Sequence, residues 1–267
     1  MDFIKRELDS VKKELINGFN DPIPNEILTD FLVNGSKFVR STLAICYLKA
    51  LGCEITDRII KLIAVGELIH SASLLHDDVI DSASNRRGKS TISIQFSDKI
   101  SILSGDLLLS EGVKKLLDVD NNEVLKIFLD CTQKMSLTEI NQYFKRGTIP
   151  SDDEYIEICN GKTAVLFSAI LQSCALLSNI DVEKAKNFSE IFGICFQIKN
   201  DLDLQSSLED RQNQIYTAKD VLGIEKTNLL LDNYKKSMVE LVDDFPQNIY
   251  KEGLEGLINS LWWIKKN

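Results

Sequence analysis

The chain contains few of the residues that interrupt helices. Its 267 residues include only 4 prolines and 13 glycines. A many-stranded β-sandwich needs a turn every ten or so residues, so this scarcity argues against such an architecture. Hydrophobic residues make up 44% and charged residues 27%, which is ordinary globular composition and excludes disorder as the main state. The length suits one large domain, or at most two small ones.

Positive charge is also in short supply. The chain has 31 Lys and Arg against 40 Asp and Glu, which gives a net charge of −9. A protein this acidic repels the phosphate backbone of nucleic acids, so we expect no nucleic-acid partner. Any binding of phosphate must be local, through a few basic residues or through metal ions.

The six cysteines are scattered, without a C-x-x-C pair and without a histidine at ligand spacing. We therefore expect buried, reduced thiols, as in a cytoplasmic protein, rather than disulfides or a zinc site. The amino-terminal segment lacks the uninterrupted apolar core of a signal peptide. The longest uncharged stretch, residues 163–180, includes Ser168 and Gln172 and is too polar for a comfortable membrane span. We expect a buried helix there.

Apolar residues recur at helical spacing along almost the whole chain, as in Ile59, Leu62, Ile63 and Ile69. The prolines fall between such patterns, where helices start or stop. Only residues 91–96 alternate like a strand, and because one strand cannot form a sheet we expect the entry to the next helix. The pattern predicts a single all-α domain over residues 1–267, with roughly ten or more helices.

The residues suited to chemistry gather in residues 67–91, ELIHSASLLHDDVIDSASNRRGKST. On a helix, Asp77 and Asp81 are one turn apart and project from one face, with Asp78 beside them. Two carboxylates so placed repel each other unless the face is fully solvated or a cation lies between them. Oxygen ligands favour Mg²⁺, which usually completes its shell with waters and substrate phosphates.

The flanks of these acids favour the metal over a solvated surface. The preceding residues, among them Leu68 and Leu75, are apolar and should be buried. Arg86 and Arg87 follow, and guanidinium groups match phosphate oxygens geometrically. The segment therefore suits a diphosphate bridged by metal; the alternative is a helix cap with surface acids.

Three further clusters are ambiguous when each is taken alone. Asn200 and Asp201 follow an apolar helix and could be a helix end with surface acids. Lys37 and Arg40 lie three residues apart at a helix start, where a solvated terminus is the alternative. Lys162 stands at the head of the uncharged helix, where it could meet an anion or extend to water.

Together and in this order, these segments resemble the trans-isoprenyl (polyprenyl) diphosphate synthase family. LLHDDVIDSASNRRGKST resembles its first aspartate-rich motif, and FQIKNDLD its second. GSKFVR resembles the G-G-K-x-x-R element, SGDLL the G-D-x-L segment, and Tyr155 with Lys162-Thr163-Ala164 the Y…K-T-A stretch. The similarity runs from about Gly35 to about Tyr250.

The resemblance implies an all-α, isoprenoid-synthase-type bundle around a central cavity, usually a homodimer. It implies a prenyltransferase that joins isopentenyl diphosphate to an allylic diphosphate, releases diphosphate, and yields a longer trans-polyprenyl diphosphate. Two or three Mg²⁺ ions are expected as cofactors. The two diphosphates are the expected partners, with no nucleic acid and no membrane span, and the expected location is the cytoplasm.

The resemblance also assigns roles to individual residues. The expected Mg²⁺ ligands are Asp77, Asp78, Asp81, Asn200 and Asp201. The expected grip on the diphosphate of isopentenyl diphosphate consists of Lys37, Arg40, His70 and Arg87. Arg86 is expected to contact the allylic diphosphate. The side chains expected to face its leaving group and the developing cation are Lys162, Thr163 and Gln197.

The second motif departs from the family pattern D-D-x-x-D. Asn200 offers a carbonyl oxygen without charge, and Leu204 offers no ligand. Asp203 compensates only if the register shifts by one residue. The metal ion expected on this side should therefore bind weakly.

Two functions stay open from the sequence. The first is an active prenyltransferase. The second is a non-catalytic or weakly active regulatory or binding subunit of a heteromeric prenyl diphosphate synthase. The intact first motif favours the first. A terpene cyclase fits less well, because it does not need the grip that Lys37, Arg40 and Arg87 suggest.

The residues four and five before the first aspartate form a floor under the growing chain in this family. Here they are Ser73 and Ala72, both small. We therefore predict a product longer than three isoprene units.

Overall fold

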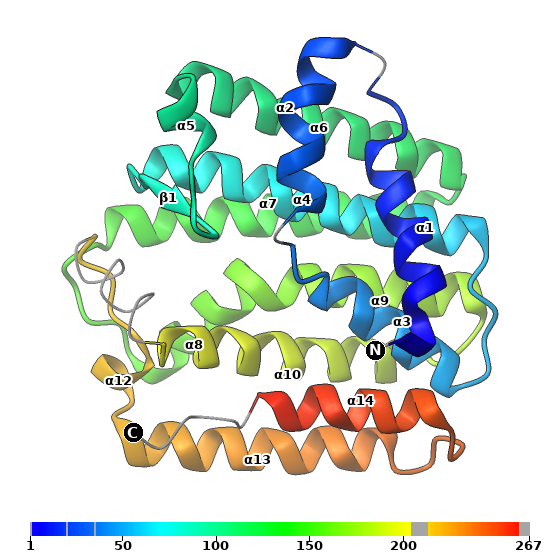
Figure 1. The fold of residues 1–267 in the computed structure, drawn as a ribbon. Coiled ribbons are helices and arrows are strands. Elements are labelled where there is room, and N and C mark those ends of the chain that lie inside the picture. The colour runs from blue at the N-terminus through cyan, green and yellow to red at the C-terminus, as the bar shows by residue number, and fades with distance from the viewer. Residues whose placement is uncertain (1, 20, 35, 204–212, 262–267) are drawn as a thin grey trace. The chain divides into compact units, whose positions relative to one another are not determined.

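The computed structural model describes residues 2–19, 21–34, 36–203 and 213–261, and most of them are helical (Figure 1). The helices are α1 Lys5–Ile16, α2 Pro22–Val33, α3 Val39–Ala50, α4 Asp57–Ile80, α5 Ile92–Gln95, α6 Asp98–Val119, α7 Asn122–Phe144, α8 Asp152–Cys159, α9 Val165–Ser178, α10 Val182–Asp201, α12 Ala218–Val221, α13 Ile224–Val242 and α14 Ile249–Ser260. A 3₁₀ turn, η1, covers Asp2–Ile4, and a π-helical turn, η2, covers Asn160–Ala164. The all-α prediction is confirmed.

The described residues contain one short hairpin, in which β1 (Asn85–Arg86) pairs antiparallel with β2 (Lys89–Ser90). The prediction for residues 91–96 is confirmed, because Thr91 caps the short helix α5 and accepts a hydrogen bond from the N–H of Ile94 at 3.3 Å. The hairpin therefore leads from the end of α4 into the next helices.

Close contacts divide the chain into two compact units. The first comprises Met1–Ile45 and Glu54–Leu125, and the second comprises Cys46–Cys53 and Lys126–Asn267. The single-domain assignment stays a prediction.

In the first unit, α4 packs along α6 (Figure 1). Its sequence is apolar on most sides, and the buried positions run from Ile59 to Asp78. At the end of α6, Arg58 donates two hydrogen bonds to the carbonyl of Val119, at 3.1 and 2.5 Å. This places a cation against a helix carboxyl end, where the helix dipole favours it. The pairing fixes the start of α4 against the end of α6.

In the second unit, α8, η2 and α9 follow one another without a break, and α10 packs against η2 and α9. Gly193 of α10 makes this approach close, since a Cβ on it would collide with the backbone of Ala164 in η2. The rings of Phe167 and Phe192 lie 5.4 Å apart in the same interface. α10 is thus held directly against the turn that carries Lys162.

Two helical stretches, Asp57–Ile80 and Asp152–Ser178, are long and apolar enough to cross a membrane by length and composition. Within their apolar windows, 72% and 67% of the residues are buried inside the protein. These stretches behave as core helices, as predicted for residues 163–180.

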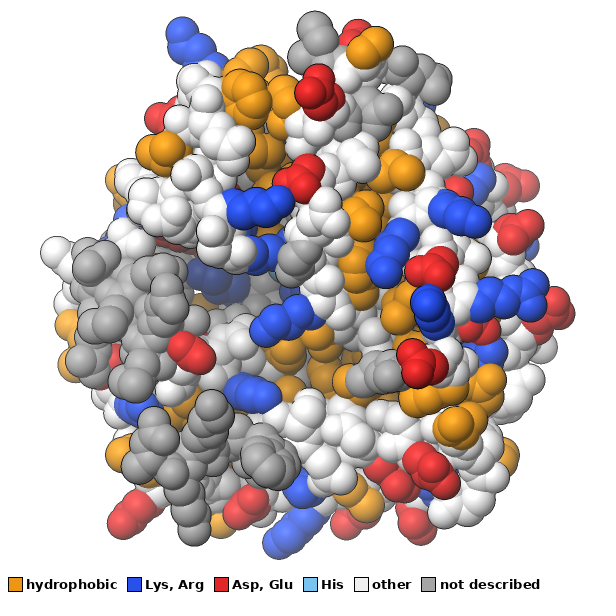
Figure 2. Space-filling view, in the orientation of Figure 1, with side chains coloured by type: hydrophobic (Ala, Val, Ile, Leu, Met, Phe, Trp, Pro, Cys, Tyr) orange, Lys and Arg blue, Asp and Glu red, His pale blue; other side chains and the backbone are white. Residues whose placement is uncertain are grey.

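All six cysteines are free, and all but Cys53, which is half-buried, are buried. The face shown in Figure 2 carries basic, acidic and hydrophobic side chains, without one sign of charge covering it.

Candidate active site

The carboxyl end of α4 carries the first acidic cluster. Asp77 and Asp81 are both half-buried, and Asp81 is the capping residue, its N–H bonded to the carbonyl of Asp77 at 2.8 Å. The helix dipole makes a carboxyl end unfavourable for anions. A cation bound near these two acids would therefore be stabilised by both carboxylates and by the helix dipole.

Asp78 has a different environment from its neighbours. It is fully buried, and its Oδ1 accepts a hydrogen bond from Nε of Arg86 at 2.6 Å. Burial raises the pKa of Asp78, while the Arg86 guanidinium works in the opposite direction. The structure thus places this acid as a partner of Arg86, more deeply buried than Asp77 and Asp81.

The hairpin after α4 presents the two arginines. Arg86 belongs to β1, and Arg87 stands in the turn with a left-handed φ of 53°, followed by Gly88 at 78°. Nη1 of Arg87 donates to Oγ of Ser36 at 2.6 Å. This bond ties the hairpin to the segment that enters α3.

The same unit brings the predicted basic residues together around His70. Burial lowers the pKa of His70 well below 6.5, and Arg40, Arg87 and Arg86 lower it further, in that order. Since each of these cations acts on one imidazole, the first motif and the GSKFVR segment converge here. Lys37 is exposed, three residues before Arg40 in the chain.

The second unit holds a chain of hydrogen bonds around Asp201. Tyr155 donates its hydroxyl to Oδ2 of Asp201 at 2.5 Å, and Nε2 of Gln197 donates to Oδ1 at 2.7 Å. Oγ1 of Thr163 donates to Oε1 of Gln197 at 2.5 Å. Asp201 is 5% exposed, and burial raises its pKa against these hydrogen bonds. The chain of bonds orients Gln197 and Thr163, two residues predicted for the site.

Lys162 is held from α7. Its Nζ donates to Oε1 of Gln142 at 3.2 Å and lies 3.6 Å from Oε2 of Glu139. Both Lys162 and Thr163 belong to the π-helical turn η2. Such turns carry an extra residue and occur frequently at functional sites.

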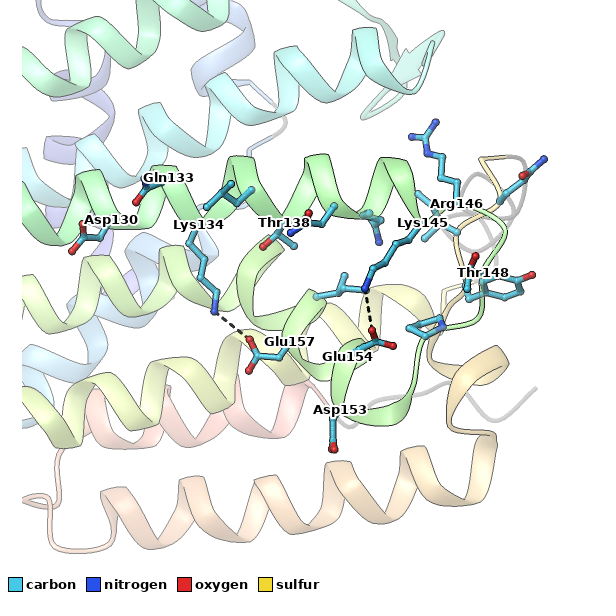
Figure 3. Close-up of a pocket in the computed structure, with 18 residues that line it drawn as sticks. Asp130, Gln133, Lys134, Thr138, Lys145, Arg146, Thr148, Asp153, Glu154 and Glu157 are labelled. Carbon is cyan, nitrogen blue, oxygen red and sulfur yellow. Dashed lines mark hydrogen bonds and ion pairs between the residues drawn. The ribbon is translucent and has the colours of Figure 1, made fainter.

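A separate groove of about 780 Å³ lies between α7 and α8 (Figure 3). Lys134 pairs with Glu157 at 3.2 Å and Lys145 with Glu154 at 3.0 Å across it. None of the predicted site residues lines this groove. The pairing removes much of the positive charge that a diphosphate would need.

The two acidic clusters differ in their fitness for Mg²⁺. Among the described residues, no three His, Cys, Asp or Glu side chains converge as a metal cage. Asp77 and Asp81 fit an ion held by two carboxylates and completed by water and phosphate. Asn200 is uncharged, and both carboxylate oxygens of Asp201 accept hydrogen bonds. The second cluster therefore fits Mg²⁺ poorly, while Gly35 and Leu204 lie outside the described residues.

Two residues of these networks were not predicted from the sequence. They are Glu67, which is 5% exposed, and Ser41, which donates hydrogen bonds to it. Tyr155 was part of the Y…K-T-A resemblance, but its hydrogen bond to Asp201 was not predicted. A glutamate within the apolar run 59–69 was the available signal for Glu67.

The family model for polyprenyl synthetase matches residues 21–242. The chain belongs to the polyprenyl synthetase family. A curated prenyl transferase of Cyanidium caldarium is 33% identical to it over 224 residues, which is 76% of this chain and 68% of that protein. The chain thus spans about two thirds of the length of this relative. As a family member, it is a trans-prenyltransferase.

Solved structures agree with the fold of this chain. A decaprenyl diphosphate synthase from Rhodobacter capsulatus matches with a TM-score of 0.87 at 20% identity, covering 97% of this chain and 96% of that one. A geranyltransferase from Helicobacter pylori, complexed with magnesium and isoprenyl diphosphate, matches with a TM-score of 0.80 at 21% identity, covering 98% and 97%. The isoprenoid-synthase-type all-α fold is confirmed.

Proposed function

We propose that this protein condenses isopentenyl diphosphate with an allylic diphosphate and releases a longer trans-polyprenyl diphosphate. The observation that carries the proposal is the grouping, within one unit, of Asp77 and Asp81 with a cluster of cations around His70. This combination suits substrates that bear diphosphates, one of them held through metal.

Asp77 and Asp81 would hold Mg²⁺ on the allylic diphosphate, with two or three ions in total. Bound Mg²⁺ would stabilise the negative charge that grows on the diphosphate as the allylic C–O bond breaks. Arg86, kept in place by Asp78, contacts the same diphosphate. Because Nε of Arg86 is occupied by Asp78, its terminal nitrogens are the groups left for phosphate oxygens.

The diphosphate of isopentenyl diphosphate is bound by Lys37, Arg40, His70 and Arg87. The lowered pKa of His70 makes it a neutral hydrogen-bonding group at pH 7, so the charge comes from the other three. Arg40 is 9% exposed, which strengthens its interaction with an anion because little water screens it.

Lys162, Thr163 and Gln197 act on the allylic leaving group and the developing carbocation. Their side chains are oriented before substrate binds, Thr163 and Gln197 by hydrogen bonds to each other and Lys162 by Gln142. Preorganised dipoles stabilise the transition state more than the ground state. The double bond of isopentenyl diphosphate then attacks the cation, and the released diphosphate takes the proton. No side-chain nucleophile takes part.

A second candidate function is a weakly active or regulatory subunit of a heteromeric synthase. The observation that favours it is the second acidic cluster, where Asn200 lacks charge and Asp201 is occupied by Tyr155 and Gln197. The intact first cluster supports the catalytic function over this one.

We further propose that the protein forms homodimers in the cytoplasm. The exposed face of α6 carries an apolar stripe, in which Leu103 is 62%, Leu107 38% and Leu117 60% exposed. A second copy of the chain would cover this stripe. Light scattering should give twice the chain mass of 30.1 kDa, and Leu103→Glu should shift it to the monomer. The free cysteines support the cytoplasmic location.

The deciding experiment is a product assay. Purified protein is incubated with labelled isopentenyl diphosphate, Mg²⁺ and one of several allylic primers, and the products are resolved by chain length. Extension by the protein alone supports the catalytic proposal. Extension only after a second subunit is added supports the regulatory alternative.

A further inference from the structure

Glu67 is a buried acid that the proposed reaction does not use. It lies in the middle of α4, ten residues before the first aspartate of the motif, and is 5% exposed. Burial of a carboxylate is costly unless hydrogen bonds and opposite charges compensate it. Its partners therefore indicate what the fold gains from it.

Ser41 donates two hydrogen bonds to Glu67. The backbone N–H of Ser41 donates to Oε1 at 3.2 Å, and the Ser41 hydroxyl donates to the same oxygen at 2.6 Å. Ser41 is the third residue of α3, so its N–H has no partner within the helix. Glu67 thus serves as a long-range cap of α3, and it adds negative charge where the helix dipole favours it.

The start of α3 is the segment that carries Lys37 and Arg40. Phe38, between them, adopts a left-handed φ of 50° and is 6% exposed. This conformation is unfavourable for an aromatic residue and persists only where the surroundings impose it. The hydrogen bonds from Ser41 to Glu67 anchor the chain three residues after Phe38.

Glu67 also interacts with the other end of the basic group. Its charge raises the pKa of Arg87, against the lowering by burial and by Arg86. Arg87 in turn donates to Ser36, the residue just before Lys37. One carboxylate therefore interacts with both chain segments that supply cations to His70.

We propose that Glu67 is a positioning residue for the binding of isopentenyl diphosphate. It fixes the start of α3, next to Arg40, and balances the charge of Arg87 before substrate arrives. It touches no substrate and acts through these residues. The inference rests on the proposed function, since it concerns the affinity for the diphosphate that these cations bind.

The test compares Glu67→Ala with Glu67→Gln. The alanine variant loses the acceptor for Ser41, and we expect its KM for isopentenyl diphosphate to rise about tenfold or more. Its kcat and its KM for the allylic primer should stay within about threefold of wild type. The glutamine variant keeps a carbonyl acceptor but loses the charge, so its KM should lie between those of the alanine variant and the wild type. A KM for isopentenyl diphosphate that is unchanged in Glu67→Ala overturns the proposal.

Glu111→Ala is the matched control. Glu111 is also a buried acid of the first unit, 7% exposed on α6, and it pairs with Lys114 and Lys115. Its loss should lower the melting temperature and leave both KM values unchanged. An equal rise of both KM values in Glu67→Ala and Glu111→Ala would mean that Glu67 has a general structural role, and would overturn the proposal.

Two further measurements keep the inference testable. If Glu67→Ala does not fold, Ser41→Ala removes only the hydroxyl donor and should raise the same KM about threefold; no rise overturns the proposal. If Glu67→Ala folds, hydrogen exchange of the Ser41 amide should be faster in it than in wild type, because the amide has lost its acceptor. This measurement does not depend on catalytic activity. Calorimetry of wild-type protein with isopentenyl diphosphate tests the proposed function separately. If no binding is measured, the proposed function is rejected. The exchange measurement still reports whether Glu67 caps α3.

Discussion

Arg86 and Asp78 form an ion pair within the first motif, with Nε of the arginine 2.6 Å from Oδ1 of an aspartate that is fully buried. The middle acid of the motif therefore faces the hairpin, while the acids on either side of it are half-buried. Adjacent aspartates in one helical turn thus have separate tasks, because consecutive side chains project about 100° apart.

Substitution of the three aspartates should separate these tasks. Asp77→Asn and Asp81→Asn are expected to lower kcat by about 10²-fold or more and to raise the Mg²⁺ concentration for half-maximal activity. Asp78→Asn should instead destabilise the fold by about 1–3 kcal/mol, because Arg86 loses its charged partner but remains partly exposed. Magnesium titrations and urea unfolding of the three variants check this. A Mg²⁺ requirement in Asp78→Asn as high as in Asp81→Asn would place Asp78 among the metal ligands.

The half-buried His70 should make the fold sensitive to mild acid. Its pKa in the folded state lies well below 6.5, so only the unfolded chain takes up its proton as the pH falls through 6.5. Stability is then fully present above 6.5 and decreases below it, by up to about 1.4 kcal/mol per pH unit until the folded pKa is reached. Unfolding free energies at pH 7.5 and 5.5 should differ in wild type and differ less in His70→Asn. Equal differences in the two proteins would contradict the assignment.

Alanine substitutions at two glycines should change stability in opposite directions, because one glycine is packed against η2 and the other is not. Gly193→Ala forces a Cβ against the backbone of Ala164 and should destabilise the protein by about 1–3 kcal/mol. It should also lower kcat, because the displaced turn carries Lys162 and Thr163. Gly256→Ala on α14 meets nothing within 4 Å and should stabilise by about 0.5–1 kcal/mol without an effect on turnover. Thermal unfolding and steady-state kinetics of both variants provide the comparison.

The second acidic cluster offers a gain-of-function test. Asn200→Asp restores a carboxylate at the end of α10 and should lower the Mg²⁺ concentration for half-maximal activity by about tenfold, since added ligand charge tightens such sites. Tyr155→Phe removes one donor to Asp201 and should cost about 1–3 kcal/mol of stability with little change in Mg²⁺ requirement. If Asn200→Asp leaves the titration unchanged, this end of α10 has no part in metal binding.

The small residues before the first motif should control product length. Ala72 is fully buried and Ser73 is half-buried, with its hydroxyl bonded to the carbonyl of His70 at 2.8 Å. Ala72→Phe and Ser73→Phe are expected to shorten the product, since a ring would block the growing chain. Products are separated by chain length from each variant. If both variants give the same distribution of product chain lengths as wild type, these two positions do not control product length.

The sequence predicted the helical fold because apolar spacing is a local property that survives in the tertiary structure. The family resemblance also predicted that Arg40, His70 and Arg87 bind one diphosphate, and the effect of both arginines on His70 agrees with this. The contact between Glu67 and Ser41 was beyond its reach, because no local pattern specifies a partner 26 residues away.

Backbone detail was equally hidden from sequence reasoning. Phe38 and Arg87 adopt left-handed φ values of 50° and 53° that neither residue prefers. Tertiary contacts impose these conformations, so propensity gives no hint of them. Asp201 illustrates the same limit, since its partner Tyr155 comes from a different helix.

The extra residue in η2 has a consequence for how this protein can change over generations. An α-helix turns by about 100° per residue, so removal of one residue from Asn160–Ala164 would leave a regular helix but rotate all of α9 by that angle. Phe167 and its apolar neighbours would then point away from α10. Single-residue deletions should therefore be far less tolerated in this turn than in the loops at either end of the long helix, although both leave the composition almost unaltered.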